Sequence, residues 1–97
     1  MSEDAQVTVR NNPAERRYEA VDGSGAVTGF ADYVEHGGAI VFTHTEVDDA
    51  VGGQGVGSTL VQAALDDVRA SGTPVVVRCP FIRAWIGRHP DYQDLLS

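Results

Sequence analysis

The sequence predicts an α+β fold built on a mixed α/β sheet, with the element order β-β-β-β-α-β-α. The first half of the chain carries short stretches rich in β-branched and aromatic residues, separated by glycine- and asparagine-rich turns. The period then changes, because apolar residues recur every three or four positions between Val56 and Val68, as in an amphipathic helix. A wholly apolar stretch, Val75–Val77, follows that helix and completes a strand–helix–strand unit.

Four strands are expected before the helix, and their turn residues separate them. They are Val7–Val9, Arg16–Val21, Ala26–Val34 and Ala39–Val47. The breaks fall at Asn11-Asn12-Pro13, at Asp22-Gly23-Ser24-Gly25 and at His36-Gly37-Gly38. Consecutive strands with such short connections pair antiparallel. Only residues 11–15 separate the first two strands, which leaves little chain to cover that side of the sheet.

The second half alternates helix and strand. A helix is expected from Gly55 to Ala70, ended by Ser71-Gly72 and Thr73-Pro74. The crossover makes the strand Val75–Val77 parallel to the strand Ala39–Val47. Pro80 can begin a last helix that ends before Pro90, with Phe81 and Trp85 expected on its core face.

Composition limits the class of protein. The 97 residues predict one domain over 1–97, with residues 1–5 frayed, and seven basic against fourteen acidic residues argue against nucleic acid as a partner. No apolar run approaches the ~20 residues of a membrane span, and the acidic N-terminus does not resemble a secretory signal. A single cysteine suits a reducing compartment. We expect a cytoplasmic monomer or weak dimer without membrane contact.

Glycines gather at the start of the first helix, in the turn Gly52-Gly53-Gln54-Gly55-Val56-Gly57-Ser58. Glycine at a helix start costs backbone entropy, so either the loop is simply flexible or its backbone must approach something closely. Bare N–H groups at a helix N-terminus can hold phosphate without a basic side chain. The Walker A motif is absent because Gly57, not lysine, precedes Ser58, and the dinucleotide fingerprint lacks its last glycine. The turn is therefore either a flexible strand-to-helix loop or a site for a phosphate-bearing cofactor that uses neither of these motifs.

The strand, this turn and the apolar-faced helix resemble motif A of the GCN5-related N-acetyltransferases. The segments Thr43–Asp48, Cys79-Pro80-Phe81 and Arg88–Tyr92 resemble the small YjdJ-type branch of that superfamily, and the resemblance extends over about residues 16–96. It implies that acetyl-CoA binds where the fourth and fifth strands separate, with its pyrophosphate on the amides of the turn. The cofactor-binding residues that it implies are Val47, Gly53, Gln54, Gly55, Val56, Gly57, Ser58 and Cys79.

The chain departs from that family's pattern at two positions. Gly52 stands where the motif usually has Arg or Gln, so a side-chain contact to the pyrophosphate is missing. Ile86 stands where many larger relatives place a tyrosine general acid, and Tyr92 lies beyond Pro90.

Three residues are candidates for catalysis: Cys79, Glu46 and His44. Cys79 follows the apolar strand, where a thiolate could accept the acetyl group; it could equally line the cofactor channel or be a small core residue. His44 and Glu46 are two apart on one strand and are possible bases or surface residues. They could also hold a metal, but no third ligand is evident, and we expect none.

The predicted function is acetyl-CoA-dependent N-acetyl transfer to an amine, either a small molecule or a protein lysine, through an open acceptor site. The alternative is a non-catalytic module that binds CoA or acyl-CoA. A cofactor-free interaction domain would leave the glycines at the helix start without a reason.

Overall fold

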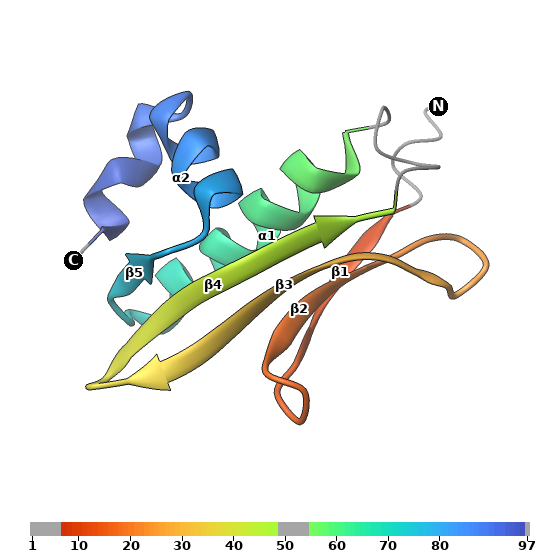
Figure 1. The fold of residues 1–97 in the computed structure, drawn as a ribbon, viewed down its shortest axis with the longest axis horizontal. Helices are drawn as coiled ribbons and strands as arrows, with labels where there is room; N and C mark the ends of the chain where they lie inside the picture. Colours follow the sequence, from red (N-terminus) through yellow and green to blue (C-terminus); the bar gives the residue numbers. More distant parts are fainter. Residues whose placement is uncertain (1–6, 49–54, 97) are drawn as a thin grey trace.

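The structure is a computed structural model that describes residues 7–48 and 55–96. Its elements are β1 (Thr8–Asn12), β2 (Arg17–Val21), β3 (Val27–His36), β4 (Ala39–Val47), α1 (Val56–Ser71), β5 (Val75–Val77), α2 (Pro80–Gly87) and the 3₁₀ helix η3 (Pro90–Leu95). The predicted order is confirmed (Figure 1). The sequence reasoning did not anticipate η3.

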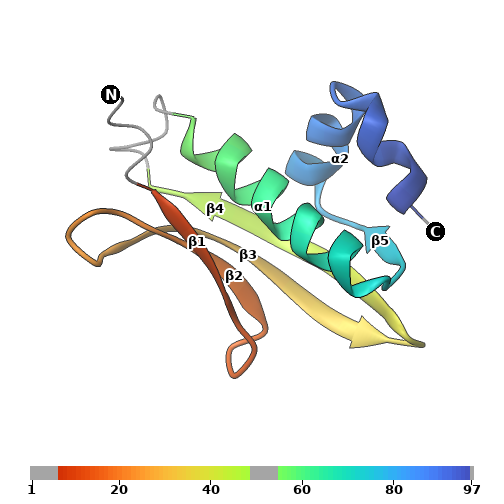
Figure 2. The ribbon, with the colours of Figure 1, turned by 180° about the vertical axis from the view of Figure 1, so that it is seen from behind.

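The five strands form one mixed sheet in chain order, with β1 to β4 antiparallel and β5 parallel to β4. Helix α1 lies across one face of this sheet, as the view from behind shows most clearly (Figure 2). Its apolar stripe packs on Ala20, Ala31 and Phe42 from the strands. The Tyr18 hydroxyl reaches out of the same core to donate to Asp67 of α1 at 2.6 Å, and burial together with this bond raises the pKa of Tyr18. No helix in 7–48 or 55–96 could cross a membrane.

Two strands are longer than the sequence predicts. The expected stop at Asn11 and Asn12 is wrong, because both residues pair with β2 and the turn begins at Pro13 instead. Arg16 belongs to that turn, with a left-handed φ of 55°. His36 is not a turn residue but pairs with Ala39, while Gly37 and Gly38, both at positive φ, form the tight hairpin loop.

A β-bulge interrupts β4 in its middle. Asp32 of β3 pairs with His44 and Tyr33 pairs with Phe42, so that Thr43 has no partner of its own in β3. An extra residue reverses the alternation of side chains beyond it. The side chains of Thr45 and Val47 consequently point to the same, helix-covered side as Phe42, and those of His44 and Glu46 point to the other side.

The start of α2 differs from prediction at one residue. Trp85 is 1% exposed and belongs to the core as expected, but Phe81 is 44% exposed. A Cβ built on Gly57 would lie 2.6 Å from the Phe81 ring, so the ring lies over the first turn of α1. Phe81 is therefore a contact between the two helix starts and not a core residue.

Candidate active site at the separation of β4 and β5

The central feature of the site is the edge that β4 exposes where β5 leaves it. Only Ile40–Phe42 pair with β5, and the last bond of that ladder runs from the Arg78 N–H to the Phe42 carbonyl at 2.9 Å. Beyond the bulge, residues 43–47 have no strand on this side within the described ranges. The Asp48 N–H bonds to Thr28 of β3, so strand alternation directs the backbone groups of Thr45 and Val47 toward the open edge. An extended ligand could bind there as a strand does.

Helix α1 begins beside this edge. Gly55 caps the helix with φ 76°, a conformation that favours glycine, and nothing lies within 4 Å of a Cβ built there. The first bond of the helix joins the Thr59 N–H to the Gly55 carbonyl, which leaves the N–H groups of Val56, Gly57 and Ser58 without an acceptor inside the helix. The first turn also carries no acidic residue. These are the features of a phosphate site.

The glycines of the turn therefore serve different purposes. Gly55 is favoured by its positive φ. Gly57 leaves room for the Phe81 ring, since a Cβ at that position would lie 2.6 Å from Phe81 and 3.4 Å from Val47, and the ring would have to shift. The implied ligands Gly53 and Gln54, with Gly52, lie outside the described residues. Backbone conformation at Gly55 and packing at Gly57 are thus reasons for glycine in this segment that need no ligand.

Cys79 lies between the open edge and α2. It is the N-cap residue of α2, is 2% exposed, and its thiol donates to the Thr45 hydroxyl oxygen at 3.2 Å. This contact joins α2 to β4 just beyond the bulge. A thiol that is 2% exposed and bonded to Thr45 does not have the accessible position of a covalent acetyl acceptor, because the thioester must reach it.

His44 and Glu46 lie on the opposite side of β4 from Cys79. They form a pair with His44 Nε2 2.7 Å from Glu46 Oε2, and their side chains are 54% and 61% exposed. The described residues contain no group of three side chains that could hold a metal ion. The pair leaves Nδ1 of His44 available to other partners, since the carboxylate engages only Nε2. The three predicted catalytic residues therefore lie on opposite sides of the sheet, with His44 and Glu46 on one side and Cys79 on the other.

The face with His44 and Glu46 carries two rows of side chains across the sheet, and all but Phe30 are polar. One row is Arg10, Glu19, Phe30 and Glu46, and the other is Asn12, Arg17, Asp32 and His44. Glu19 is 2% exposed and accepts hydrogen bonds from Arg17 at 2.7 Å, Arg10 at 2.9 Å and Asn12 at 3.2 Å. The Arg17 bond, with those from Arg10 and Asn12, holds the pKa of the Glu19 carboxyl below its usual value. This network joins β1 and β2 on the open face through one buried carboxylate.

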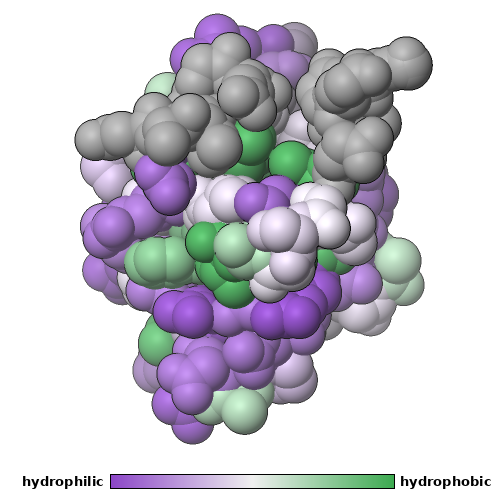
Figure 3. All heavy atoms as spheres, turned by 90° about the vertical axis from the view of Figure 1, so that its right-hand side faces the viewer, coloured by the Kyte–Doolittle hydropathy of each residue, from purple (hydrophilic) through white to green (hydrophobic). Residues whose placement is uncertain are grey.

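A groove of about 330 Å³ borders this face at the end of β4. Its lining residues are Arg17, Val27, Thr28, Gly29, Phe30, Glu46, Val47 and Asp48. The Arg17 guanidinium lies over the Phe30 ring at 4.8 Å, so part of the groove wall is an aromatic ring covered by a cation. Seen from this end, the molecule shows apolar side chains beside a band of polar ones (Figure 3).

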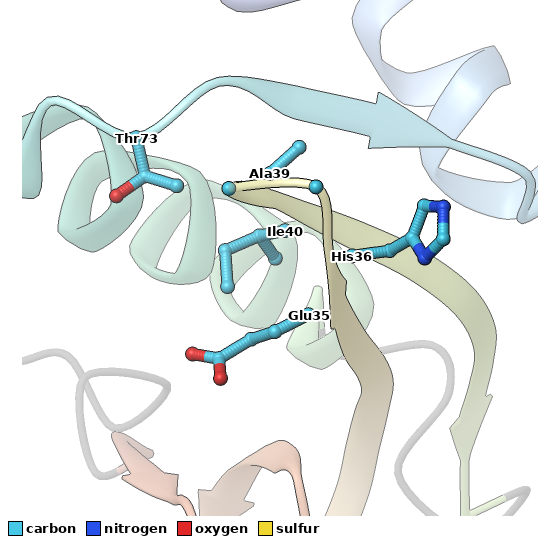
Figure 4. Close-up of a pocket in the computed structure, with 7 residues that line it drawn as sticks. Glu35, His36, Ala39, Ile40 and Thr73 are labelled. Atoms are coloured by element: carbon cyan, nitrogen blue, oxygen red, sulfur yellow. The ribbon is translucent and has the colours of Figure 1, made fainter.

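A second cavity, of about 410 Å³, lies at the other end of β4. It is formed by the tip of the β3–β4 hairpin and Thr73, with Glu35, His36, Ala39 and Ile40 around it (Figure 4). Because β4 has nine residues, roughly 26 Å of strand separates its two ends. This cavity contains none of the predicted site residues.

Sequence reasoning missed three residues of the site. Thr45 is the partner of Cys79, Phe81 covers the start of α1, and the ring nitrogen of Trp85 donates to the Ser58 hydroxyl oxygen at 2.9 Å. The signal for Trp85 was available, because a buried indole N–H normally has a partner. The positions of Thr45 and Phe81 depend on the bulge and on helix packing, which local patterns do not reveal.

Comparison with known proteins defines the class. Residues 17–95 match the model of a family described as GCN5-related N-acetyltransferase, so the chain belongs to that family. The solution structure of a GCN5-like protein from Staphylococcus aureus superposes with a TM-score of 0.71 at 23% identity, covering 96% of this chain and 90% of that chain. A search of curated proteins finds no match.

Membership of this family confirms the resemblance at the level of the superfamily and assigns the protein to the acetyltransferases. The family generally uses acetyl-CoA. The assignment to the YjdJ-type branch stays a prediction, as do the roles of the individual site residues.

Proposed function

We propose that this protein transfers the acetyl group of acetyl-CoA to a primary amine. The observation that carries the proposal is the juxtaposition of an unpaired β4 edge, the N–H groups of Val56–Ser58, which have no acceptor inside α1, and Cys79. The pantetheine arm would pair with the backbone of Thr45 and Val47, and the pyrophosphate would bind the amides at the start of α1. Backbone groups supply these contacts, which is consistent with a chain of formal charge −7 holding a phosphate-bearing cofactor.

The amine acceptor would approach from the open face of the sheet. The groove of about 330 Å³ meets β4 at Glu46 and Val47, next to the edge where the thioester would lie. Glu46 and Asp48 at its rim favour a cationic acceptor, because opposite charge attracts an ammonium group. The short connection between β1 and β2 leaves this face uncovered by any helix among the described residues.

Acetyl transfer needs the amine deprotonated before it attacks the thioester carbon. His44 is the base that we propose, with Glu46 bound to Nε2 to hold the ring in place. As the amine nitrogen forms its bond to the acetyl carbon, the carbon–sulfur bond breaks and CoA leaves as a thiolate. The proton taken from the amine goes to His44.

Protonation of the leaving thiolate does not fall to Tyr92 in this arrangement. Its hydroxyl donates to Asp66 on the outer side of α1 at 2.8 Å, and that bond raises the pKa of Tyr92. Ile86, at the position of the usual tyrosine, is 2% exposed. The thiol of Cys79 or solvent would supply the proton, with Cys79 acting near the thioester and not as an obligatory acyl carrier.

Two measurements test the proposal and separate it from the alternative of a non-catalytic CoA-binding module. Calorimetric titration with CoA should show binding, and release of free thiol from acetyl-CoA should depend on an added amine. A panel of polyamines, free amino acids and lysine-containing peptides would identify the acceptor. Binding without thiol release on any amine would leave the binding module as the function, and no binding at millimolar CoA would refute both.

A further inference from the structure

The side chain of Trp85 connects the C-terminal part of the protein to the start of α1. It is 1% exposed, and its Nε1–H donates to the Ser58 hydroxyl oxygen at 2.9 Å. Ser58 is the third residue of α1, so its own backbone N–H has no acceptor inside the helix. Ser58 therefore receives one hydrogen bond from Trp85 and retains two donors, its N–H and its O–H.

The bond from Trp85 determines what the hydroxyl of Ser58 can do. A serine hydroxyl near a helix start can turn back to a backbone acceptor or point outward, and its rotamer is ordinarily free. Occupying the oxygen with an indole donor fixes the side chain and leaves the hydroxyl hydrogen to be donated elsewhere. A hydroxyl that accepts one bond is also a better donor of the next, because hydrogen bonds in a chain polarise one another.

Three contacts hold the indole of Trp85 in this position. His89 stacks on it at 3.8 Å with an interplanar angle of 12°, and Tyr92 meets it edge-on at 5.0 Å. The His89 ring nitrogen Nδ1 is 2.8 Å from the Trp85 carbonyl oxygen. Tyr92 is itself fixed to α1 through Asp66 at 2.8 Å. The C-terminal helices therefore act as a support for the position of the indole N–H.

We infer that Trp85 is a positioning residue for cofactor binding, which aims the hydroxyl of Ser58 at the pyrophosphate of CoA. This inference rests on the proposed function, since it assigns a role within the same phosphate site. It also gives a reason for tryptophan at a core position, where a phenylalanine would fill most of the same space without a donor. Ser58 is thus a side-chain ligand in a turn that lacks the usual Arg or Gln at Gly52.

The test is a double-mutant cycle on CoA affinity, with Trp85→Phe, Ser58→Ala and the double variant. Trp85→Phe keeps an aromatic ring in the stack and removes the N–H, together with part of the buried ring volume. We expect Kd for CoA to rise about three- to tenfold in each single variant, the range of one ordinary hydrogen bond. The double variant should bind like Ser58→Ala alone, because Trp85 acts through Ser58. Ser71→Ala, at the far end of the same helix, is the matched control and should bind like the wild type.

Two further readouts distinguish positioning from a purely structural role. Pantetheine lacks the pyrophosphate, so its affinity should not change in Trp85→Phe. Trp85 is the single tryptophan, so CoA should shift its fluorescence emission in the wild type and shift it less in Ser58→Ala, a variant that alters an exposed position. This measurement decides the question even if Trp85→Phe folds poorly.

The inference would be overturned if Trp85→Phe weakened CoA binding equally in the wild type and in Ser58→Ala. It would also be overturned if Trp85→Phe weakened the binding of CoA and of pantetheine equally. An unchanged fluorescence response in Ser58→Ala would do the same. Failure of the wild type to bind CoA would instead refute the proposed function and this inference together.

Discussion

A negative charge introduced at Gly55, the N-cap residue of α1, is the most direct test of where the cofactor phosphates bind. Gly55 has φ 76° and ψ 14°, and apart from its chain neighbours no described residue lies within 4 Å of a Cβ built on it. Gly55→Asp and Gly55→Asn both fit that space, and both carry the same cost of left-handed backbone, which Asp and Asn tolerate better than most residues. The two variants are nearly isosteric, so they differ in one negative charge placed in the open space before the helix.

The size of that charge effect can be estimated. At a separation of about 5 Å, two unit charges repel by about 0.8 kcal/mol in water and by about 3 kcal/mol at an effective dielectric of about 20. A pyrophosphate carries more than one charge, so we expect Gly55→Asp to bind CoA at least tenfold more weakly than Gly55→Asn, which is about 1.4 kcal/mol.

Isothermal titration calorimetry of both variants, at low and high salt, measures this difference. High salt should reduce the difference in CoA affinity between the two variants, because the charges lie near solvent. The thermal unfolding temperatures of the two variants should be similar. Equal affinities of the Asp and Asn variants for CoA would refute the placement of the pyrophosphate at this turn.

Three other substitutions test separate parts of the site and the fold. Cys79→Ala should leave slow turnover and cost about 1 kcal/mol of stability; a rapidly formed acetyl adduct on Cys79 by intact-mass spectrometry, with complete loss of activity in the variant, would instead make it the nucleophile. His44→Gln should lower kcat by about 100-fold while CoA affinity stays unchanged in calorimetry, and an unaltered pH–rate profile would exclude His44 as the base. Glu19→Gln should destabilise the fold by about 2 kcal/mol at neutral pH. Because the folded pKa of Glu19 is depressed, the stability it contributes is present above its ordinary value of 4.5 and is lost as pH falls through the folded value. The difference in unfolding free energy between the wild type and Glu19→Gln, measured by urea denaturation, should therefore disappear in acid. A difference that does not change with pH would contradict this account.

The element order could be predicted because it depends on local patterns. The change from β-rich stretches to a three- and four-residue period at Val56, and the return to an apolar strand at Val75, are properties of short windows. The parallel pairing of β5 with β4 follows from the crossover between them. The glycine cluster likewise marks the start of α1 as a candidate phosphate site, since positive φ and bare N–H groups are local backbone features.

Short stretches of sequence do not reveal which side chains from distant parts of the chain come into contact. The bulge at Thr43 depends on how β3 and β4 pair, and it alone moves Thr45 to the side of Phe42 and Cys79 while His44 turns to the open face. Without that extra residue, simple alternation from Phe42 would place His44 toward the core.

The sequence by itself thus determined the class of fold, the position of the helix start after β4, and the lack of basic side chains in the turn Gly52–Ser58. Only the tertiary structure decided that Cys79 bonds to Thr45, that Phe81 covers Gly57 in place of joining the core, and that Trp85 donates to Ser58. The physical reason is that these contacts join residues 24 to 34 positions apart, whose meeting is fixed by strand register and helix packing and not by the preferences of neighbouring residues.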